Sequence, residues 1–225
     1  MIVTAHQPGY LPWLGYFDKI AKSDLFIFLD SVQFEKNSFT NRNKIKSPQG
    51  PIWLTVPVKL KGHLASTINE LPIDNTQQWQ DKHLRSIYAN YKKVPSFELK
   101  YGKLNELYRR PYEFLADLCY DHLLFWLREL GLSDKRILRS HELPVTSHKS
   151  DLILDLCSYT NADVYISGVF GKEYLDEEKF CRNQIKIVYQ GYNHPVYPQA
   201  WGDFIPYLSI LDFWMNCDQY RMIWE

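Results

Sequence analysis

The chain has 225 residues, and its 26 basic and 26 acidic side chains give a formal charge of zero at pH 7. This balance argues against a general electrostatic attraction to nucleic acid or to an anionic membrane. A chain of this length can bury a substantial core, either as one large domain or as a domain with an added helical part. We predict a single α/β domain over residues 1–225, with residues 76–131 as a helical subdomain.

Cysteine spacing and the N-terminal sequence indicate the cellular compartment. The four cysteines form no CxxC pair, which argues against a zinc knuckle or a redox dithiol, so we expect reduced and mostly packed thiols. The start MIVTAH lacks the basic and apolar regions of a secretory signal. No apolar run approaches the length of a membrane span. We therefore expect a cytoplasmic protein without an integral membrane segment.

The N-terminal segment predicts a βαβ unit with an irregular loop after its first strand. The apolar strand ends at His6, and Pro8 and Pro12 can neither continue a strand nor lie inside a helix. A helix is expected over about 14–22. Residues 25–29 form a continuous apolar run that is typical of a buried parallel strand.

Polar residues follow both of these strands. In an open α/β sheet, ligands bind at the carboxyl ends of the strands. The segments at those ends are 6–8, which reads HQP, and 30–33, which reads DSVQ. The sequence contains no GxGxxG motif and no GxxxxGK[ST] motif, so ordinary dinucleotide and P-loop chemistry are not expected.

The next segments predict a third strand and a loop. Residues 34–46 are polar, residues 47–51 form a turn, and residues 52–56 are predicted to add a third strand to the same sheet. Residues 59–75 contain glycine and proline and are expected to form a loop with a short strand near 66–68.

From Gln77 the apolar pattern takes a helical period. The first stripe consists of Trp79, His83, Ile87 and Tyr91. Further helices are expected over 101–108 and 111–130, with Pro111 at the start of the second and Gly131 as its C-terminal cap. We interpret these aromatic stripes as packing surfaces.

The last third predicts a second βαβ unit and a final helix. Its elements are a strand at 136–139, a helix at 149–158, a strand at 162–166 and a further strand at 185–190. The turn over 167–172 contains two glycines and a lysine, and its backbone N–H groups could hold an anion. The final helix begins near Ser209, with Ser209 or Tyr207 near the N-cap and Asp212 in the first turn.

His6 and Asp30 have both chemical and structural interpretations. His6 can act as a general base or bind a phosphate, whereas a structural histidine would be satisfied by a backbone carbonyl. Its position beside Gln7, Pro8 and Pro12 favours function, because such a strand end suits core packing poorly. Asp30 can coordinate Mg²⁺ or orient a substrate amine, or it can cap the next turn.

Three further groups have the same two kinds of interpretation. Arg42 between Asn41 and Asn43 can clamp a phosphate or a carboxylate, or it can belong to a solvated loop. Lys172 in the glycine turn has both interpretations as well. His194 lies in an aromatic segment that is either a second polar site or a buried loop.

These considerations give a set of candidate residues. The catalytic candidates are His6, Asp30, Arg42 and Lys172. The candidates for binding substrate or nucleotide are Gln7, Pro8, Tyr10, Pro12, Gln33, Asn41, Asn43, Ser167, Gly168, Gly171, Tyr174, Tyr192, His194, Tyr197, Gln199, Ser209 and Asp212. No GxSxG, HExxH or Cys–His pattern occurs, so hydrolase and zinc chemistry are not expected, and no protein metal site is predicted.

Several motifs together identify a family resemblance. They are HQPGYLPWLGY (6–16), NRNKI (41–45), ISG (166–168), GKEYL (171–175), HPVYPQ (194–199) and LSILD (208–212). With these motifs the chain resembles the WbqC-like family from its first strand to Asn216. That family is associated with bacterial surface-polysaccharide (O-antigen) gene clusters. The resemblance implies a transferase that adds glycine or another acyl group to an amino sugar.

The first βαβ unit is also similar in layout to the nucleotidylyltransferase and pantothenate-synthetase type of α/β fold. This similarity implies an open, mostly parallel Rossmann-like sheet with flanking helices and ATP bound by strand-end histidines, although the chain has one histidine where the HxGH motif has two. It implies acyl-adenylate formation with ATP and Mg²⁺, followed by attack of a sugar amine. In that hypothesis His6 and Arg42 hold phosphates with help from Lys172. Gln33 and Asp30 position the acid or the amine.

Two other hypotheses stay open at this point. One is an acyltransferase that uses a preactivated donor without ATP. The other is a non-catalytic sugar or nucleotide-sugar binding protein of a polysaccharide assembly complex, with Trp and Tyr rings stacking on the ligand. In each case the expected partners are small molecules, namely an amino sugar or nucleotide sugar and, for the transferases, a small carboxylic acid.

Overall fold

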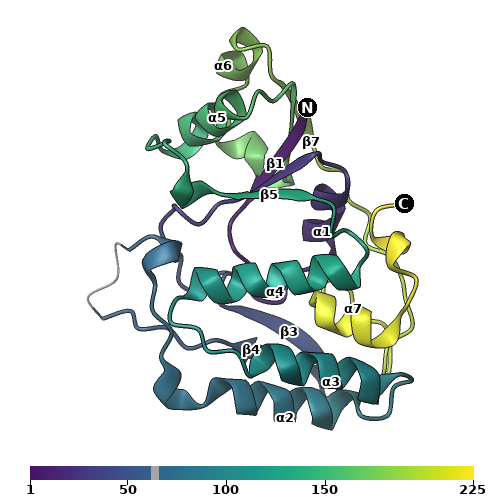
Figure 1. Cartoon of the computed structure of the whole chain (residues 1–225). Helices are drawn as coiled ribbons and strands as arrows, with labels where there is room; N and C mark the ends of the chain where they lie inside the picture. Colours follow the sequence, from purple (N-terminus) through teal and green to yellow (C-terminus); the bar gives the residue numbers. More distant parts are fainter. Residues whose placement is uncertain (62–65) are drawn as a thin grey trace.

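A computed structural model describes residues 1–61 and 66–225 of the chain, and its centre is a five-stranded parallel sheet (Figure 1). The strands are β1 (Ile2–His6), β2 (Leu25–Phe28), β5 (Arg136–Arg139), β6 (Val164–Ser167) and β7 (Lys186–Tyr189). Their order across the sheet is β5-β2-β1-β6-β7, and every neighbouring pair is parallel. The predicted open parallel α/β fold is therefore confirmed.

The strand order places a topological switch point in the middle of the sheet. The chain builds outward from β1 to β2 and β5, and it then crosses to β6 on the other side of β1. The connections from β1 and from β6 consequently leave in opposite directions, which opens a crevice at the carboxyl ends of these two strands. The loop after His6 and the turn after Ser167 border this position.

The alternation of side chains along β2 divides the core between the two faces of the sheet. Leu25 and Ile27 pack in one cluster with the helices α5 (Lys149–Tyr159) and α6 (Glu177–Arg182). Phe26 and Phe28 point to the other face, where α1 (Leu14–Ala21) and the remaining helices pack. The continuous apolar run of the sequence is thus explained by a strand that is buried on both faces.

A second layer of helices and a β-hairpin covers the α1 face (Figure 1). Its elements are β3 (Arg42–Ser47), β4 (Gly50–Thr55), α2 (Trp79–Tyr91), α3 (Phe97–Tyr108), α4 (Leu115–Glu129) and α7 (Ile210–Asn216). One continuous hydrophobic cluster joins this layer to the sheet, with Ile45 and Leu54 contributed by the hairpin. The division into a domain and a helical subdomain at 76–131 stays a prediction.

Short 3₁₀ segments connect the main elements. They are η1 (Ile68–Glu70), η2 (Asn75–Gln77), η3 (Ser140–Glu142), η4 (Val169–Glu173) and η5 (Tyr220–Ile223). The cysteines are free, and Cys119, Cys157 and Cys217 are buried whereas Cys181 is exposed. Within residues 1–61 and 66–225, no helix combines the length and the apolar character needed to cross a membrane.

The predicted third strand of the main sheet is wrong. Residues 50–55 form β4, which pairs in antiparallel register with β3 and belongs to a separate two-stranded sheet. The reason is local, because a short turn brings Gly50 opposite Ser47 and reverses the chain. Gly50 has a φ of 109°, a backbone conformation that a side chain disfavours.

Two element boundaries also differ from prediction. The helix expected from Pro111 begins at Leu115, where the Leu115 N–H donates to the Leu71 carbonyl at 2.9 Å. The short strand expected near 66–68 is a single bridge between Gln33 and Thr67, followed by η1. The loop predicted for 59–75 falls partly on residues 62–65, which lie outside the described residues.

Other predicted features are confirmed. Gly131 ends α4 with a φ of 74°, and the Leu132 N–H donates to the Leu127 carbonyl at 2.7 Å, as in a glycine-capped helix end. The first helical stripe is buried as predicted, with His83 inside it. Asp212 lies in the first turn of α7, as predicted.

Asp212 anchors the helical layer through buried hydrogen bonds. Its carboxylate accepts from the Tyr91 hydroxyl at 2.5 Å and from the Tyr197 hydroxyl at 2.9 Å. Burial raises the pKa of the Asp212 carboxyl above its ordinary value, and these two hydroxyl donors oppose that shift. One side chain therefore joins α2, the segment before α7 and α7 itself.

We expect Asp212→Ala to lower the free energy of unfolding by about 2–4 kcal/mol, because two buried hydroxyl donors lose their acceptor. Urea unfolding at pH 7 measures this change. Asp155→Ala removes an exposed carboxylate from α5 and should change the free energy by less than about 0.5 kcal/mol. An equal effect of the two substitutions would contradict the structural role of Asp212.

Three histidines whose pKa values are lowered in the folded protein make the fold sensitive to acid. Burial lowers the pKa of His6 and His122 to about 3 and that of His83 to about 4. Because these pKa values lie below the ordinary value of about 6.5, the unfolded chain binds more protons than the folded chain as the pH falls below about 6.5. The stability present at neutral pH should therefore be lost as the pH falls from about 6.5 towards 3–4.

We expect His122→Leu to reduce the slope of the unfolding free energy against pH between pH 6 and pH 4.5. The reduction should correspond to roughly one fewer proton taken up per molecule on unfolding. His122 is fully buried, and neither ring nitrogen has a hydrogen-bond partner among the described residues, so leucine leaves no polar atom unpaired. Urea unfolding across this pH range gives the slope. His148→Leu, at an exposed histidine, is the control and should keep the wild-type slope. An unchanged slope in His122→Leu would contradict the prediction.

Candidate functional site

A cavity of about 550 Å³ lies at the switch point of the sheet. It is lined by His6, Gln7, Pro8, Trp13, Lys19, Glu35, Ser38, Phe39, Thr40, Gly168, Val169, Phe170, Gln190 and Tyr207. A smaller cavity of about 210 Å³ adjoins it, since both are lined by His6, Gln7, Lys19, Gly168 and Phe170. We refer to the two cavities together as the switch-point pocket.

The loop after β1 is held open by bonds from other elements. The Asn43 amide donates to the Leu11 carbonyl at 2.6 Å, and the Ile210 N–H donates to the Pro12 carbonyl at 2.8 Å. The Tyr10 N–H donates to the carbonyls of Phe39 and Thr40. Prolines prevent this loop from forming regular structure, and the hairpin and α7 fix its path instead.

Lys19 brings a buried amine into the pocket. Its Nζ donates to the Ala5 carbonyl at 3.2 Å, and only 3% of the residue is exposed. Burial lowers the pKa of Lys19 to about 8, although the neighbouring Asp18 opposes the shift. Within the described parts of the chain no carboxylate forms an ion pair with Lys19, because Asp18 pairs with Lys22 at 2.5 Å and accepts from Gln190 at 2.6 Å.

His6 is neutral at physiological pH and faces the same cavity. Burial, and secondarily the charge of Lys19, lowers its pKa to about 3. The His6 Nδ1 lies 3.0 Å from the Gln7 carbonyl oxygen, which assigns the proton to Nδ1 and the lone pair to Nε2. The rings of Trp13 and Tyr16 contact the imidazole at centroid distances of 5.0 and 4.9 Å. His6 is therefore a hydrogen-bond acceptor rather than a cation.

The turn after β6 forms the opposite wall and depends on Gly171. A Cβ atom at this position would lie 1.9 Å from the Ser167 Oγ, which is too close for any side chain. The Ser167 hydroxyl donates to the Gly168 carbonyl at 3.0 Å and holds the turn. Lys172 lies outside the lining, with its Nζ 5.1 Å from the centre of the Tyr189 ring.

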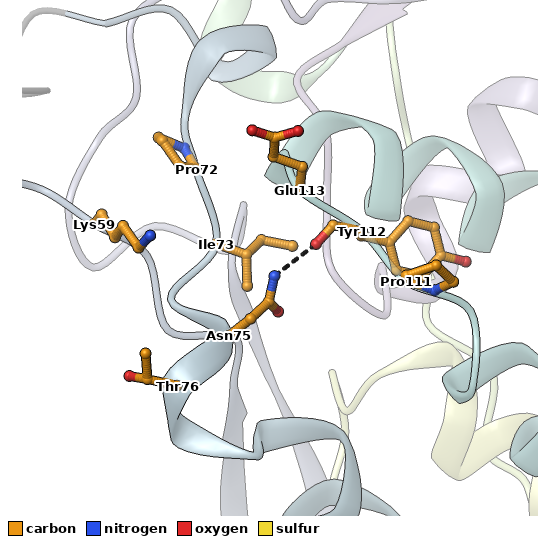
Figure 2. A pocket seen from close by; sticks show the side chains of 8 residues that line it. All are labelled: Lys59, Pro72, Ile73, Asn75, Thr76, Pro111, Tyr112 and Glu113. Carbon is orange, nitrogen blue, oxygen red and sulfur yellow. Dashed lines mark hydrogen bonds between the residues drawn. The ribbon is translucent and has the colours of Figure 1, made fainter.

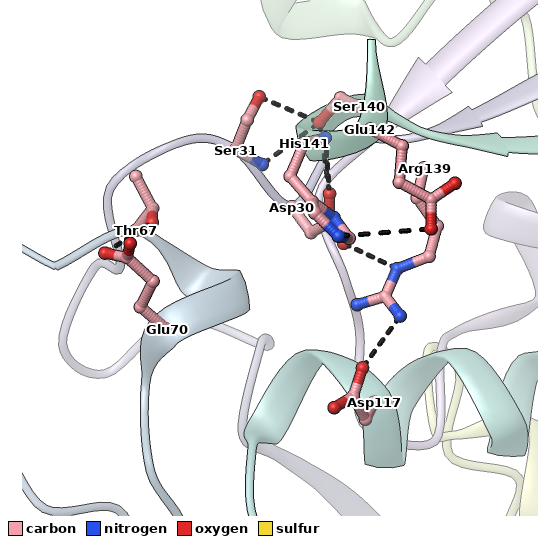
Figure 3. Close-up of polar contacts among 9 residues, drawn as sticks. All are labelled: Asp30, Ser31, Thr67, Glu70, Asp117, Arg139, Ser140, His141 and Glu142. Atoms are coloured by element: carbon pink, nitrogen blue, oxygen red, sulfur yellow. Dashed lines mark hydrogen bonds and ion pairs between the residues drawn. The ribbon is translucent and has the colours of Figure 1, made fainter.

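A second polar cluster occupies the carboxyl ends of β2 and β5 (Figure 3). Asp30 is fully buried, and its carboxylate accepts from the Arg139 Nε at 2.9 Å and from the His141 Nδ1 at 2.8 Å. It also accepts from the Ser140 hydroxyl at 3.2 Å and from the backbone N–H of His141 at 3.1 Å. The Arg139 Nη1 reaches Asp117 at 2.7 Å.

This arrangement orients the His141 imidazole. Because Nδ1 donates to the Asp30 carboxylate, the Nε2 atom carries the lone pair, and 29% of the side chain is exposed. The nearest carboxylate to Nε2 is Glu142, at 4.0 Å. A buried carboxylate behind a partly exposed imidazole is an arrangement suited to a general base.

A larger hollow of about 670 Å³ lies away from these strand ends (Figure 2). It is lined by Lys59, Pro72, Ile73, Asn75, Thr76, Pro111, Tyr112 and Glu113. The Asn75 amide in it is already bound to the Tyr112 carbonyl at 2.8 Å. It shares no lining residue with the switch-point pocket, so we do not assign the chemistry to it.

The predicted site residues are distributed over several parts of the structure. The switch-point pocket contains or borders His6, Gln7, Pro8, Ser167, Gly168, Gly171 and Tyr174. Asp30 lies in the cluster with His141, and Gln33 lies on the loop that pairs with Thr67. Arg42, Asn41 and Asn43 lie at the hairpin, and the two amides donate to backbone carbonyls, Asn41 to that of Val56 at 2.8 Å.

The remaining candidates lie among the helical layer and the segments that surround α7. The hydroxyl of Tyr10 contacts His83 at 2.7 Å. The Tyr207 N–H donates to the His194 Nε2 at 3.2 Å, and the Tyr192 ring packs against Gly15, where a Cβ would lie 2.9 Å from the ring. Gln199 accepts from the buried amine of Lys46 at 3.0 Å. Pro12, Tyr197, Ser209 and Asp212 complete this region.

Several residues of the pocket and the Asp30 cluster were not predicted. Gln190 is the last residue of one predicted strand and His141 closely follows another, so the rule that found His6 could also have found them. Lys19 carries no such signal, because it lies within an amphipathic helix. Phe39, Phe170 and Tyr207 contribute apolar walls from loops whose paths the sequence pattern does not specify.

Comparison with known proteins supplies the family. The model of the WbqC-like protein family matches residues 7–223. Uncharacterized protein Rv1507c of Mycobacterium tuberculosis (strain ATCC 25618 / H37Rv) is 36% identical over 218 residues, which cover 95% of this chain and 93% of that protein. No solved structure matches the chain significantly. The family match extends over nearly the whole sequence and includes residues 7–16 of the HQPGYLPWLGY loop that builds the pocket, so the chain belongs to the WbqC-like protein family.

Proposed function

We propose that the protein transfers an amino acid, such as glycine, or another acyl group to the amine of an amino sugar in bacterial surface-polysaccharide biosynthesis. In this proposal ATP activates the carboxylate inside the switch-point pocket. The observation that carries the proposal is a cavity of about 550 Å³ at the carboxyl ends of β1 and β6 with a buried amine in its lining. Its volume lies within the range of about 300–1,000 Å³ that small-molecule sites occupy.

The pocket offers suitable partners for a carboxylate and a nucleotide phosphate. Lys19 is mainly protonated at pH 7 with a pKa of about 8, and it lacks an ion-pair partner within the described residues. An anion is therefore the ligand that compensates its burial. The neutral His6 can accept a hydrogen bond from a ribose hydroxyl or an ammonium group through Nε2. Trp13 and Phe39 provide aromatic faces for a flat ring.

The proposed chemistry has two steps. A carboxylate oxygen attacks the α-phosphorus of ATP, the bond from that phosphorus to the pyrophosphate oxygen breaks, and pyrophosphate leaves. The neutral amine of the sugar then attacks the acyl carbon, the carbon–oxygen bond to AMP breaks, and AMP leaves with the electron pair. The amine nitrogen loses one proton as the amide forms. Lys19 would stabilise the negative charge of the transferring group in the first step.

The Asp30–His141 pair is the proposed acceptor of that proton. It lies on the same carboxyl edge of the sheet as the pocket, since Phe28 pairs with His6 on one side and with Arg139 on the other. Adjacent strands are separated by about 4.8 Å, so Arg139 and His6 are roughly 10 Å apart across the sheet. A sugar of ordinary size can bridge this distance. Asp30 would position the imidazole and stabilise its protonated form.

Binding of a nucleotide sugar without turnover is a second candidate function. The exposed aromatic rings at the pocket rim favour it, because Phe170 is 73% exposed and Tyr207 is 64% exposed. Such rings stack on sugars and bases in binding proteins as well as in enzymes. The two functions differ in whether ATP is consumed.

Thermal unfolding with Mg²⁺ and ATP tests the pocket. At ATP concentrations near 100 times the dissociation constant we expect the Tm to rise by roughly 5–10 °C. Lys19→Met should remove this rise, whereas Lys82→Met, an exposed lysine on α2, should keep it. The comparison uses the ATP-induced shift of each variant, because removal of a buried charge changes the Tm of the free protein. No shift in the wild type would exclude ATP activation.

His141→Gln separates catalysis from binding. It should keep the ATP-induced shift but reduce by about 100-fold or more the amide formed from glycine, glucosamine and ATP, because no base accepts the amine proton. Pyrophosphate release and mass spectrometry of the amide are the measurements. Wild-type protein that binds ATP but releases no pyrophosphate with glycine or other small carboxylates would favour the binding function. Equal turnover in His141→Gln and wild type would contradict the role of His141.

The titration of Lys19 provides an independent check of the pocket. In protein labelled with ¹³C-lysine, we expect one Cε resonance to titrate near pH 8, because burial lowers the pKa of Lys19. This resonance should be absent in Lys19→Met and present in Lys82→Met. Saturating Mg²⁺ and ATP should raise its midpoint, since an anion favours the protonated amine. A Lys19 midpoint near the ordinary value of about 10.4 would contradict the described burial.

A further inference from the structure

Aromatic and cationic side chains form a continuous strip from the switch-point pocket onto the β3–β4 hairpin. Trp13 in the pocket contacts Phe39 at a centroid distance of 5.9 Å, and Phe39 contacts Trp53 at the same distance. The Arg42 guanidinium carbon lies 4.4 Å from the centre of the Trp53 ring, and the Lys44 Nζ lies 4.8 Å from it. We call these five residues the hairpin strip.

The outer rings of the strip are exposed to solvent. Phe39 is 46% exposed and Trp53 is 43% exposed, although both are large apolar side chains. Isolated exposed rings are common on protein surfaces, but rings that contact one another and lead into a pocket mark a binding surface. The strip therefore extends the pocket rather than standing apart from it.

The positive charges of the strip are not neutralised by carboxylates in the part of the chain that the structure describes. Among the described residues, neither Arg42 nor Lys44 forms an ion pair with a carboxylate. The Arg42 Nη2 donates to the Asn37 carbonyl at 2.6 Å, which fixes the guanidinium, whereas its Nε is buried and has no partner among the described residues. A buried N–H donor without a partner is costly, and an anionic ligand would satisfy it.

The hairpin holds the two cations on one side. Side chains alternate along β3, so Arg42 and Lys44 share a face and Asn43 points to the other, where it is buried and bound to the Leu11 carbonyl. Lys44 pairs directly with Trp53 of β4. The anchored asparagine and the paired strand make the strip a rigid surface, which lowers the entropy lost on binding.

We propose that the hairpin strip binds the nucleoside diphosphate part of a nucleotide sugar. The base would stack on the exposed part of Trp53, and Arg42 and Lys44 beside that ring would contact the two phosphates. The sugar would extend past Phe39 into the pocket, where the amine is acylated. The role of the sugar as acceptor rests on the proposed function, whereas binding of the nucleoside diphosphate does not.

The size and charge of the strip select this ligand class. Two cations match two phosphate groups, and a guanidinium held in one plane favours bidentate contact with phosphate oxygens. A nucleic acid would need a longer positive track, and the chain carries no net charge. The aromatic path into the pocket places the group beyond the diphosphate next to Lys19 and His6.

Isothermal titration with uridine diphosphate tests the inference. We expect Arg42→Met and Lys44→Met to raise the dissociation constant about tenfold each, and the double variant to raise it further. Arg42→Lys keeps the charge and should recover part of the affinity lost in Arg42→Met. Lys186→Met, at an exposed lysine of β7, removes one charge elsewhere and should leave the dissociation constant unchanged. Unfolding curves of each variant verify that the fold is retained.

Two outcomes would overturn the inference. One is no binding of uridine diphosphate to the wild type at millimolar concentration. The other is binding that Lys19→Met weakens but the strip variants do not, which would place the nucleotide inside the pocket. Retained uridine diphosphate binding together with no release of pyrophosphate from ATP and small carboxylates would support the strip and remove the proposed ATP-dependent function. The two proposals therefore fail separately.

Discussion

The loop between β1 and α1 is the constraint on which the rest of the site depends. Its prolines end the central strand of the sheet at the topological switch point, so the chain must leave the sheet there without regular structure. Side-chain and backbone donors from the hairpin and from α7 then fix the loop at Leu11 and Pro12. The same bonds join the parallel sheet to the helical layer, and the pocket forms on the side of the loop that they leave open. A change in this loop would therefore alter the pocket and the contact between the layers together.

Buried charge is distributed unevenly over the molecule. Asp30 receives four hydrogen bonds and Asp212 receives two hydroxyl donors, so both carboxylates are compensated within the fold. Lys46 is also buried, and it donates to Gln199 and to the Asp203 carbonyl. Lys19 has one long bond to a carbonyl and no described carboxylate partner. Because a buried charge without compensation costs free energy, the position where a ligand would relieve that cost is the switch-point pocket.

The sequence predicts the parallel strands well because their burial leaves a direct pattern. The apolar run at 25–29 and the strand ends at His6 and Ser167 follow from hydrophobicity and from proline or glycine alone. The hairpin is not found by such analysis, because its partly buried cations alternate with asparagines that point inward and the strand resembles a polar loop. Lys19 is not found by such analysis for another reason, because its pocket is formed by β1 and by the turn after β6, which lie far apart in the sequence. The rule that ligands bind at the carboxyl ends of parallel strands identifies more of the site than the predicted residues alone, because it leads to Gln190 and His141 once every strand is placed.

Under the two proposals, the arrangement would place activation and recognition at different positions. Lys19 and His6 lie inside the cavity, where low polarity strengthens their electrostatic effect, whereas Arg42 and Lys44 lie on a rigid outer hairpin where a charged ligand can first make contact. Phe39 belongs to both regions, since it lines the pocket and contacts Trp53. An acceptor held by its diphosphate at the hairpin would thus reach the pocket with its sugar end, and the aromatic contact would shield the activated carboxylate from water. In such a geometry the hairpin would determine the specificity for the acceptor, and the residues at the carboxyl edge of the parallel sheet would determine the reaction.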